Sequence, residues 1–383
     1  MGWDDVLRRS FLAATVAGLG SVLTDRLPAG GAPLAEESLG SFATVLGELR
    51  QLDAADGAAS VIMPAHWLAA RLTRTLGNTP AEHELHRPLA TVTANAAELA
   101  GWASFETGDY SEALRWDDQS IVAARNAGDP DITAFAGEAR ARVVWLGLGD
   151  TEAALRSLDQ ISLAGVTGQI SAHVDEGRAR ALAVAGKERA SLRTSDRAAE
   201  ASADDGPSWA GWCGSSAHVT VGRGLALVDL GLGHPAHRLL GECLRALPPQ
   251  LRRAAGTVQR GLGQAAMQMG EPKQAVVHLV AAHRLLSATR SRQVGTVHAV
   301  ARELQARYGD VRAVRELPDR LRTDTRYVVC RTSGDRLRIH LRTCHYAGKG
   351  GAQPWVVGER LDPAEVAASP ASAGYELCER CLE

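Results

Sequence analysis

The stretch Gly101-Trp102-Ala103-Ser104-Phe105-Glu106-Thr107-Gly108-Asp109-Tyr110-Ser111-Glu112-Ala113-Leu114 decides the fold. Gly108-Asp109 turns the chain, because glycine readily adopts the backbone conformations that end helices. The small residue Gly101 lets two helices approach closely, and Ala113 begins the packing face of the second helix. The stretch therefore predicts a pair of packed helices joined by a tight turn.

The same pattern returns along the chain. Gly263, Gly270 and Ala275 repeat the Gly-x6-Gly-x4-Ala spacing, and Gly149-Asp150 opens a similar unit. The turn glycines lie 37 to 47 residues apart, at positions 108, 149, 186, 233, 270 and 309. This period lies in the range of helix-pair solenoids and is slightly longer than the roughly 34 residues of a tetratricopeptide repeat.

The sequence thus predicts an all-α superhelical solenoid of tetratricopeptide-like helix pairs over residues 36–317. We expect an N-terminal segment over residues 1–35 and a small zinc-ribbon-like α+β module over residues 318–383. The alternative for the repeats is a generic helical bundle in which glycine simply ends each helix. The region 202–217 interrupts the repeat and is expected to form a longer loop.

Composition supports a globular, mostly helical protein. The 383 residues suggest two or three units, and hydrophobic residues make up 45% and charged residues 22%. Aromatic residues, at 4%, are too few for an aromatic-rich β-barrel. A net charge of -2 argues against wide coverage by nucleic acid or an anionic membrane. No apolar run reaches the roughly 18–20 residues of a spanning helix, so no membrane partner is expected.

The first residues allow two interpretations. Arg8-Arg9-Ser10-Phe11-Leu12 and the apolar run to Leu23 resemble a twin-arginine export signal. The acidic Asp4-Asp5 and the break at Asp25-Arg26 favour a short amphipathic helix followed by a Gly/Pro linker instead. We therefore expect a cytoplasmic protein, with twin-arginine export as the alternative.

A family resemblance covers roughly residues 5–317. Leu7-Arg8-Arg9-Ser10-Phe11-Leu12, Leu46-Gly47-Glu48-Leu49-Arg50-Gln51-Leu52-Asp53 and the degenerate repeats resemble the tetratricopeptide-type sensory region of actinobacterial helix-turn-helix transcriptional regulators. In the family a DNA-binding domain precedes this region, and we expect this chain to lack it. The resemblance implies a regulatory protein in transcription or signalling that binds a peptide or protein through its repeat groove.

The C-terminal region carries a metal-ligand pattern, His340-x3-Cys344 followed by Cys378-x2-Cys381. Tetrahedral zinc is bound by such thiolate and imidazole groups, and close pairs can reach one ion from a turn. Tyr327–Cys330 and Arg338–Leu341, joined across Ser333-Gly334, predict a β-hairpin that delivers the first pair.

The pattern is similar to small His-Cys-Cys-Cys zinc modules at the C-termini of several bacterial proteins. His345 could replace His340, and Cys330 could replace either residue. Because four ligands leave no open position, the predicted zinc is structural. The predicted ligands are His340, Cys344, Cys378 and Cys381.

The hairpin region is positively charged, with five basic residues and one acidic residue, Asp335, in residues 331–349. It could contact nucleic-acid phosphate or dock on an acidic protein surface. We favour protein docking, because no aromatic residues interleave with the charges. A peptide or protein is therefore the expected partner, a weak nucleic-acid contact the lesser alternative, and self-association a further option.

No constellation points to catalysis. Gly222-Arg223-Gly224 lacks the lysine and hydroxyl of a phosphate loop. The pairs His83/His86 and His234/His237 lack acidic partners at metal or acid–base spacing, and no nucleophile elbow occurs. We expect a non-enzymatic protein.

Overall fold

The computed structural model describes residues 36–202, residues 207–321 and four short strands between residues 327 and 377. The chain divides into two compact units between Val314 and Arg315. Residues 36–202 and 207–314 of the first unit form helices and turns and contain no strand. The first unit is therefore all-helical in its described part, as the sequence predicts.

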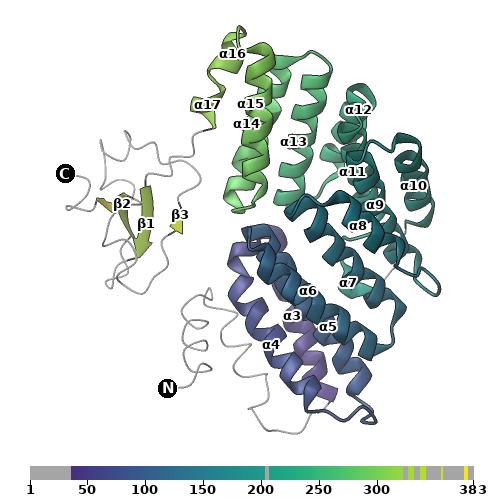
Figure 1. The fold of residues 1–383 in the computed structure, drawn as a ribbon. Helices are drawn as coiled ribbons and strands as arrows, with labels where there is room; N and C mark the ends of the chain where they lie inside the picture. The colour runs from purple at the N-terminus through teal and green to yellow at the C-terminus, as the bar shows by residue number, and fades with distance from the viewer. Residues whose placement is uncertain are drawn as a thin grey trace. The chain divides into compact units, whose positions relative to one another are not determined.

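The helices follow one another with short connections (Figure 1). In chain order they are α3 (Glu36–Asp56), η1 (Ala58–Ser60), α4 (Ile62–Gly77), α5 (His86–Thr107), α6 (Tyr110–Ala127), α7 (Pro130–Arg142), η2 (Val143–Gly147), α8 (Thr151–Asp159), α9 (Gly168–Val184), α10 (Glu188–Ala201), η3 (Ser208–Ala210), α11 (Ser216–Asp229), α12 (Gly233–Ala246), α13 (Arg252–Gln268), α14 (Pro272–Ala288), α15 (Gln293–Tyr308), α16 (Arg312–Arg315) and α17 (Leu317–Arg320).

The helices of the first unit pack in two rows. Helices α5, α7, α9, α11, α13 and α15, which we call the A helices, each contact the next A helix in the row. The B helices α6, α8, α10, α12 and α14 each pack directly against the A helix that precedes them. Repeated helix pairs therefore build the unit.

The predicted turns form where glycine and aspartate act together. Gly108 and Gly149 take positive φ angles of 89° and 77°, which L side chains adopt only with strain. The carboxylates of Asp109 and Asp150 then accept hydrogen bonds from the backbone N–H groups of Glu112 and Ala153, three residues on, and cap α6 and α8.

Two of the predicted turn glycines differ from expectation. Gly233 is the first residue of α12, and the positive φ of that turn, 77°, belongs to Gly231. Gly231 directly follows the end of α11 and its cap residue Leu230, where the left-handed conformation is needed. Gly309 ends α15 with a φ of -65°, so that helix closes without a left-handed residue.

The two full copies of the pattern make the same close contact. Ala113 and Ala275 are fully buried. A Cβ atom at Gly101 would lie 3.3 Å from the Ala113 carbonyl oxygen, and one at Gly263 would lie 3.4 Å from the Ala275 carbonyl oxygen. Glycine thus allows the close helix approach in both pairs that the sequence predicts.

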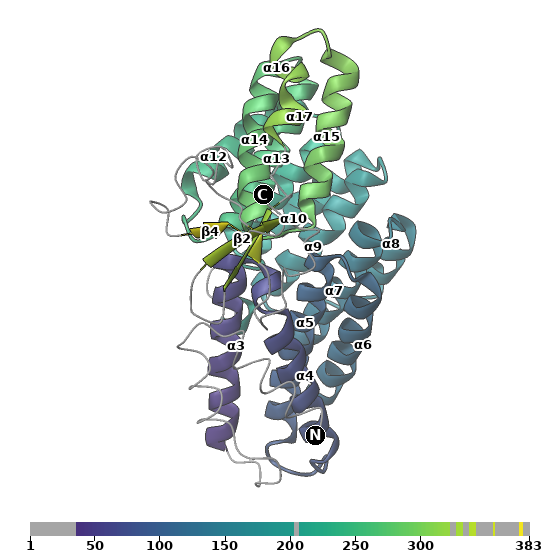
Figure 2. The ribbon, with the colours of Figure 1, turned by 90° about the vertical axis from the view of Figure 1, so that its left-hand side faces the viewer.

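Helices near the end of the first unit contact helices near its start. α13 contacts α3, and Figures 1 and 2 both show α13–α15 standing end to end with α3–α6. Gly57 packs so closely on the Thr289 carbonyl that a Cβ atom would clash there. The Arg292 N–H also donates to the Glu106 carbonyl, 3.0 Å away. These contacts join segments nearly 200 residues or more apart.

The second unit contains the predicted hairpin strands. β1 (Tyr327–Arg331) and β2 (Leu337–Leu341) pair antiparallel, with Val328 opposite His340. β3 (Trp355–Val356) pairs antiparallel with β1, and β4 (Tyr375–Leu377) pairs parallel with β2, giving the order β3-β1-β2-β4.

Within the described helices, none combines the length and the apolar character needed to cross a bilayer.

Candidate functional site

The predicted zinc ligands fall mostly outside the described residues. His340 lies in β2, and its alternative Cys330 lies in β1 opposite Arg338. Cys344, Cys378, Cys381 and the alternative His345 lie outside the described part of the chain. The zinc site therefore stays a prediction.

The first unit holds charged side chains on the A helices that the sequence analysis did not single out. On α9, Gln169, His173, Glu176 and Arg180 follow helical spacing and share one face of the helix. Charged side chains on α3, α5, α7 and α13, together with Arg292 directly before α15, are also buried or nearly buried. We call this set the buried charge network, comprising Arg50, Asp53, Glu98, Glu106, Glu138, Arg142, His173, Glu176, Arg180, Arg253, Arg260 and Arg292.

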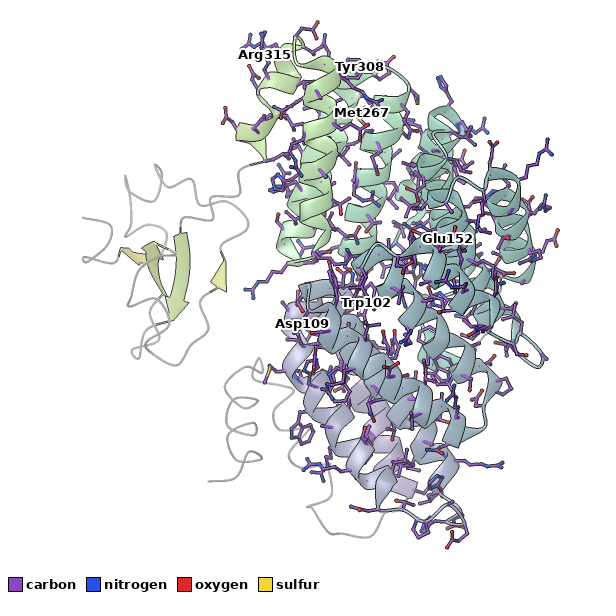
Figure 3. The ribbon with its side chains drawn as sticks, in the orientation of Figure 1. Trp102, Asp109, Glu152, Met267, Tyr308 and Arg315 are labelled. Atoms are coloured by element: carbon purple, nitrogen blue, oxygen red, sulfur yellow. The ribbon has the colours of Figure 1, made fainter. Side chains whose placement is uncertain are left out.

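One end of the network is built around Trp102 of α5 (Figure 3). Its indole N–H donates to Asp53 Oδ2 over 3.1 Å. Arg142 and Arg253 lie over its ring, with guanidinium carbons 5.0 Å and 4.9 Å from the ring centroid. Arg253 also binds Asp53 through two hydrogen bonds of 2.8 Å and 2.7 Å. This bidentate pair connects α13 with α3 and is strongly oriented.

The centre of the network is Glu138 on α7. Its Oε2 atom lies 3.0 Å from Arg142 Nη2 and 3.0 Å from His173 Nε2. Burial alone would raise the pKa of Glu138, but Arg142 and His173 lower it to about 2. Gly177 on α9 leaves room for this carboxylate, since a Cβ atom there would meet Glu138 Oε1. Glu138 is thus an ionised, buried carboxylate at neutral pH.

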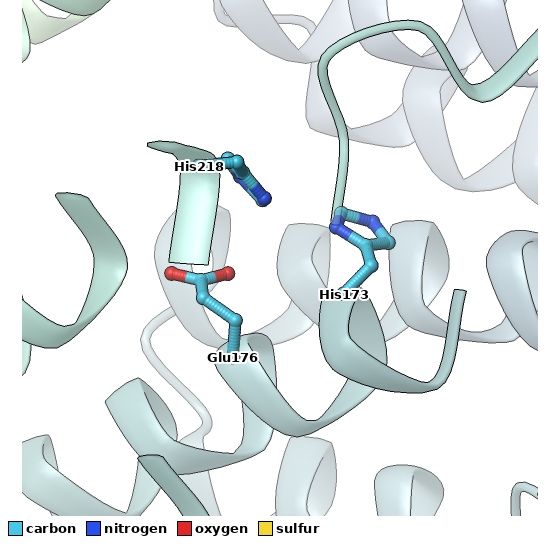
Figure 4. Close-up of side chains that lie close together, drawn as sticks. All are labelled: His173, Glu176 and His218. Atoms are coloured by element: carbon cyan, nitrogen blue, oxygen red, sulfur yellow. The ribbon is translucent and has the colours of Figure 1, made fainter. Parts of the chain in front are cut away.

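His173, Glu176 and His218 lie close together (Figure 4), and His173 is also the residue that pairs with Glu138. The first two side chains come from α9 and the third from α11. Imidazole and carboxylate groups are zinc ligands, so this trio is a candidate metal site. The Glu176 side chain fits against α11 because residue 222 is glycine. A Cβ atom at Gly222 would clash with the Glu176 side chain.

The protonation of His218 argues against metal binding. The backbone N–H of Gly214 donates to His218 Nδ1 over 3.0 Å, so the neutral ring carries its own proton on Nε2. Neither nitrogen then offers a free lone pair, whereas a metal-bound histidine normally donates from its second nitrogen. Burial, His173 and Arg142 together lower the pKa of His218 well below its usual value. His218 therefore fits a neutral hydrogen-bond acceptor better than a metal ligand.

The chain's own loop lies against the network. Gln169 on α9 donates from Nε2 to the carbonyl oxygens of Gly211 and Cys213, over 3.1 Å and 2.7 Å. Trp209 packs edge-on against Phe135 of α7, with centroids 5.2 Å apart. Burial raises the pKa of the Cys213 thiol to about 11, with Arg142 and Glu98 close enough to act on it. Residues 209–213 of the longer loop predicted here therefore pack against the A helices α7 and α9.

The sequence contained a weak signal for this network. Glu98 is an isolated charge in the alanine-rich stretch Ala94–Ala100, and Glu138 lies beside Arg140 in the similar stretch Ala134–Ala141. Such charges are usually solvent-facing, and only the packing of neighbouring A helices shows that these are buried. Gly222, which the sequence analysis set aside as a phosphate-loop residue, lies inside α11 and serves packing.

No protein-family model matches the chain, and none of the curated proteins is significantly similar to it.

Proposed function

We propose that residues 36–317 form a solenoid of tetratricopeptide-like helix pairs that binds a peptide or protein segment on its A-helix face. In this proposal the protein is a regulator or adaptor in transcription or signalling and has no catalytic role. The rows of paired helices support the first part, because stacked helix pairs present extended binding surfaces.

One observation carries the binding proposal. The A-helix face, meaning the surface formed by the A helices, binds the backbone of the loop Gly211–Gly214. A side-chain amide, Gln169, binds two backbone carbonyls of an irregular segment. Contacts of this kind recognise a backbone without demanding a particular side chain. We infer that the loop occupies part of the surface that an external peptide would use.

The test is selection of peptides from a displayed library against the full chain, followed by photo-crosslinking. A benzoylphenylalanine replaces Trp212, whose ring lies 4.7 Å from that of His218, or Val122, which is exposed on α6. Selected peptides should crosslink from position 212 and not from position 122. Crosslinking from position 122 alone, or a library that yields no binder, would contradict the proposal.

A second variant tests the role of the loop. Trp209→Ala removes the contact with Phe135, so the loop should leave the A helices more easily. Peptides that compete with the loop should then bind more tightly, since less binding free energy is spent on displacing it. Unchanged affinity would show that the loop and the peptide use different surfaces.

We also propose that the C-terminal unit is a structural zinc module with His340, Cys344, Cys378 and Cys381 as ligands. The hairpin of β1 and β2 supports it. So does the register of β4, which pairs Leu377 with Ile339, the residues that precede Cys378 and His340 in the sequence. Small modules of this kind draw much of their folding free energy from the ion.

Metal analysis of the full chain, purified under reducing conditions, tests the zinc proposal. One equivalent of zinc is expected in the wild type and in the control Cys243→Ser on α12, and far less in Cys378→Ser. Zinc well below one equivalent in the wild type would defeat it.

A further inference from the structure

Three arginines of the buried charge network lack a close carboxylate partner. Arg180 Nε lies 3.9 Å from Glu176 Oε1, and Arg292 Nε lies 3.9 Å from Glu106 Oε1. Arg260 has no ion pair within the described residues and donates only to Gln264, over 2.5 Å. By contrast, the other three arginines of the network each lie within about 3 Å of an acidic oxygen, in the pairs Arg50–Glu98, Arg142–Glu138 and Arg253–Asp53.

All three arginines also keep a donor unused. The Nε atoms of Arg180, Arg260 and Arg292 are buried and have no hydrogen-bond partner among the described residues. Arg260 as a whole is only 8% exposed. A buried donor without a partner costs free energy, so a bound group that accepts from these donors would stabilise the protein.

The three positive charges act on one another. Burial lowers the pKa of Arg260 to about 10; Asp229 opposes this effect, and Arg180 and Arg292 add to it. Asp229 is a weak counter-charge, because it is exposed to solvent, which screens its attraction for the arginines. The cluster is therefore electropositive and incompletely compensated.

The cluster borders the wide helical turn η2 and is open to solvent. Arg180 lies over the Trp145 ring at 5.1 Å, and Arg292 donates from Nη1 to the Leu146 carbonyl over 3.3 Å. The side chains of Arg180 and Arg292 remain 17% and 16% exposed, and Asp229 is exposed. Solvent therefore reaches Arg180 and Arg292 at the edge of the cluster, and an anion can approach the cluster from there.

We propose that Arg180, Arg260 and Arg292 form a binding site for one anionic group, a carboxylate or a phosphate, on the ligand of the A-helix face. Guanidinium groups bind such oxyanions through paired N–H donors, and the free Nε atoms supply them. This inference rests on the proposed function and names the chemistry of its ligand. An anion at this place satisfies the unused donors and balances the charge.

The probes are inorganic phosphate and succinate, each titrated into the full chain against sodium chloride of equal ionic strength. Thermal unfolding reports stabilisation, and isothermal titration calorimetry reports binding directly. At least one probe should raise the unfolding midpoint by several degrees more than chloride does. Preference for phosphate indicates a phosphoryl group on the ligand, and preference for succinate indicates a carboxylate.

Two variants make the test specific. Arg260→Met removes one guanidinium at similar length and should lose the stabilisation by the probe, with affinity falling at least tenfold. Without a probe, Arg260→Met should melt no lower than the wild type, because it removes a buried, unpaired charge. The control Arg223→Met removes an arginine of α11 that pairs with Asp196 at the surface, and should respond like the wild type.

Equal stabilisation by chloride and both probes would overturn the inference, as would an unchanged response of Arg260→Met. These outcomes leave the proposed function standing if library peptides still crosslink from position 212. Conversely, anion binding without any peptide binder would support the site and refute the peptide proposal.

Discussion

At the scale of single residues, Glu138 shows how much the first unit depends on one buried charge. We expect Glu138→Gln to lower the free energy of unfolding by about 3–5 kcal/mol, because Arg142 and His173 would then face a neutral amide. Urea denaturation of the full chain at neutral pH measures the difference. The matched control is Asp118→Asn, which breaks the exposed pair with Arg140 and should cost less than about 1 kcal/mol.

The same variant has a defined pH dependence. The pKa of Glu138 falls from 4.5 in the unfolded chain to about 2 in the folded chain. Its stabilisation is therefore complete above pH 4.5 and is lost as the pH falls towards 2. The gap between the wild type and Glu138→Gln should narrow in that window, and a constant gap would show that the carboxylate is not the cause.

His283 on α14 should also make the fold sensitive to acid, but in a higher pH window than Glu138. Burial and the neighbouring His298, whose ring centroid is 5.2 Å away, lower the pKa of His283 to about 4. Between pH 6.5 and 4 the unfolded chain binds more protons at this residue, so acid destabilises the fold there. His283→Leu should therefore lose less stability than the wild type on going from pH 7 to pH 5.

Urea denaturation at several pH values checks the His283 prediction. His83→Leu, at an exposed position, should follow the wild type throughout. If His283→Leu and the wild type show parallel pH profiles, His283 does not remain neutral in the folded protein.

At the scale of elements, the pair α13–α14 tests the repeat pattern. Ala275 is fully buried, and its carbonyl lies against Gly263 of α13. Ala275→Asp places an unpaired charge between packed helices, so we expect it to cost about 3–5 kcal/mol. A circular-dichroism melt with an unchanged midpoint would show that this alanine is not a packing residue of its repeat.

The features that the sequence predicted best are those determined by neighbouring residues, such as turns and hairpins. Gly108-Asp109 and Gly149-Asp150 each combine a left-handed residue with a capping carboxylate, and both turns form as expected. The same rule failed at Gly233, because Gly231 lies nearer to the end of α11. The hairpin of β1 and β2 was also predictable, since its two strands are close in sequence.

The buried charge network was not predictable in this way. Glu138 meets His173 of another helix 35 residues later, and nothing within either helix separates a buried charge from an exposed one. Gly177 and Gly222 are signals only after the neighbouring helix is known, because each makes room for a carboxylate on that helix. Tertiary packing thus decides which charges are buried.

At the scale of the first unit, the contact between α3 and α13 joins residues that are far apart in the sequence. Arg253 and Asp53, 200 residues apart, form a bidentate ion pair that is largely shielded from water. Trp102 donates to the same carboxylate and lies beneath the guanidinium group. Breaking a buried pair leaves one charge without its partner, which costs more than the pair contributes.

We therefore expect Arg253→Met and Asp53→Asn each to lower the free energy of unfolding by about 3–5 kcal/mol. The double variant should lose less than the sum, because removing both charges leaves neither unpaired; the expected coupling is about 1–3 kcal/mol. Urea denaturation of the four proteins completes the cycle, with small-angle scattering to detect separation of α13 from α3. Strictly additive losses, with an unchanged radius of gyration in both single variants, would show that the end-to-end contact does not hold the helices of the first unit together.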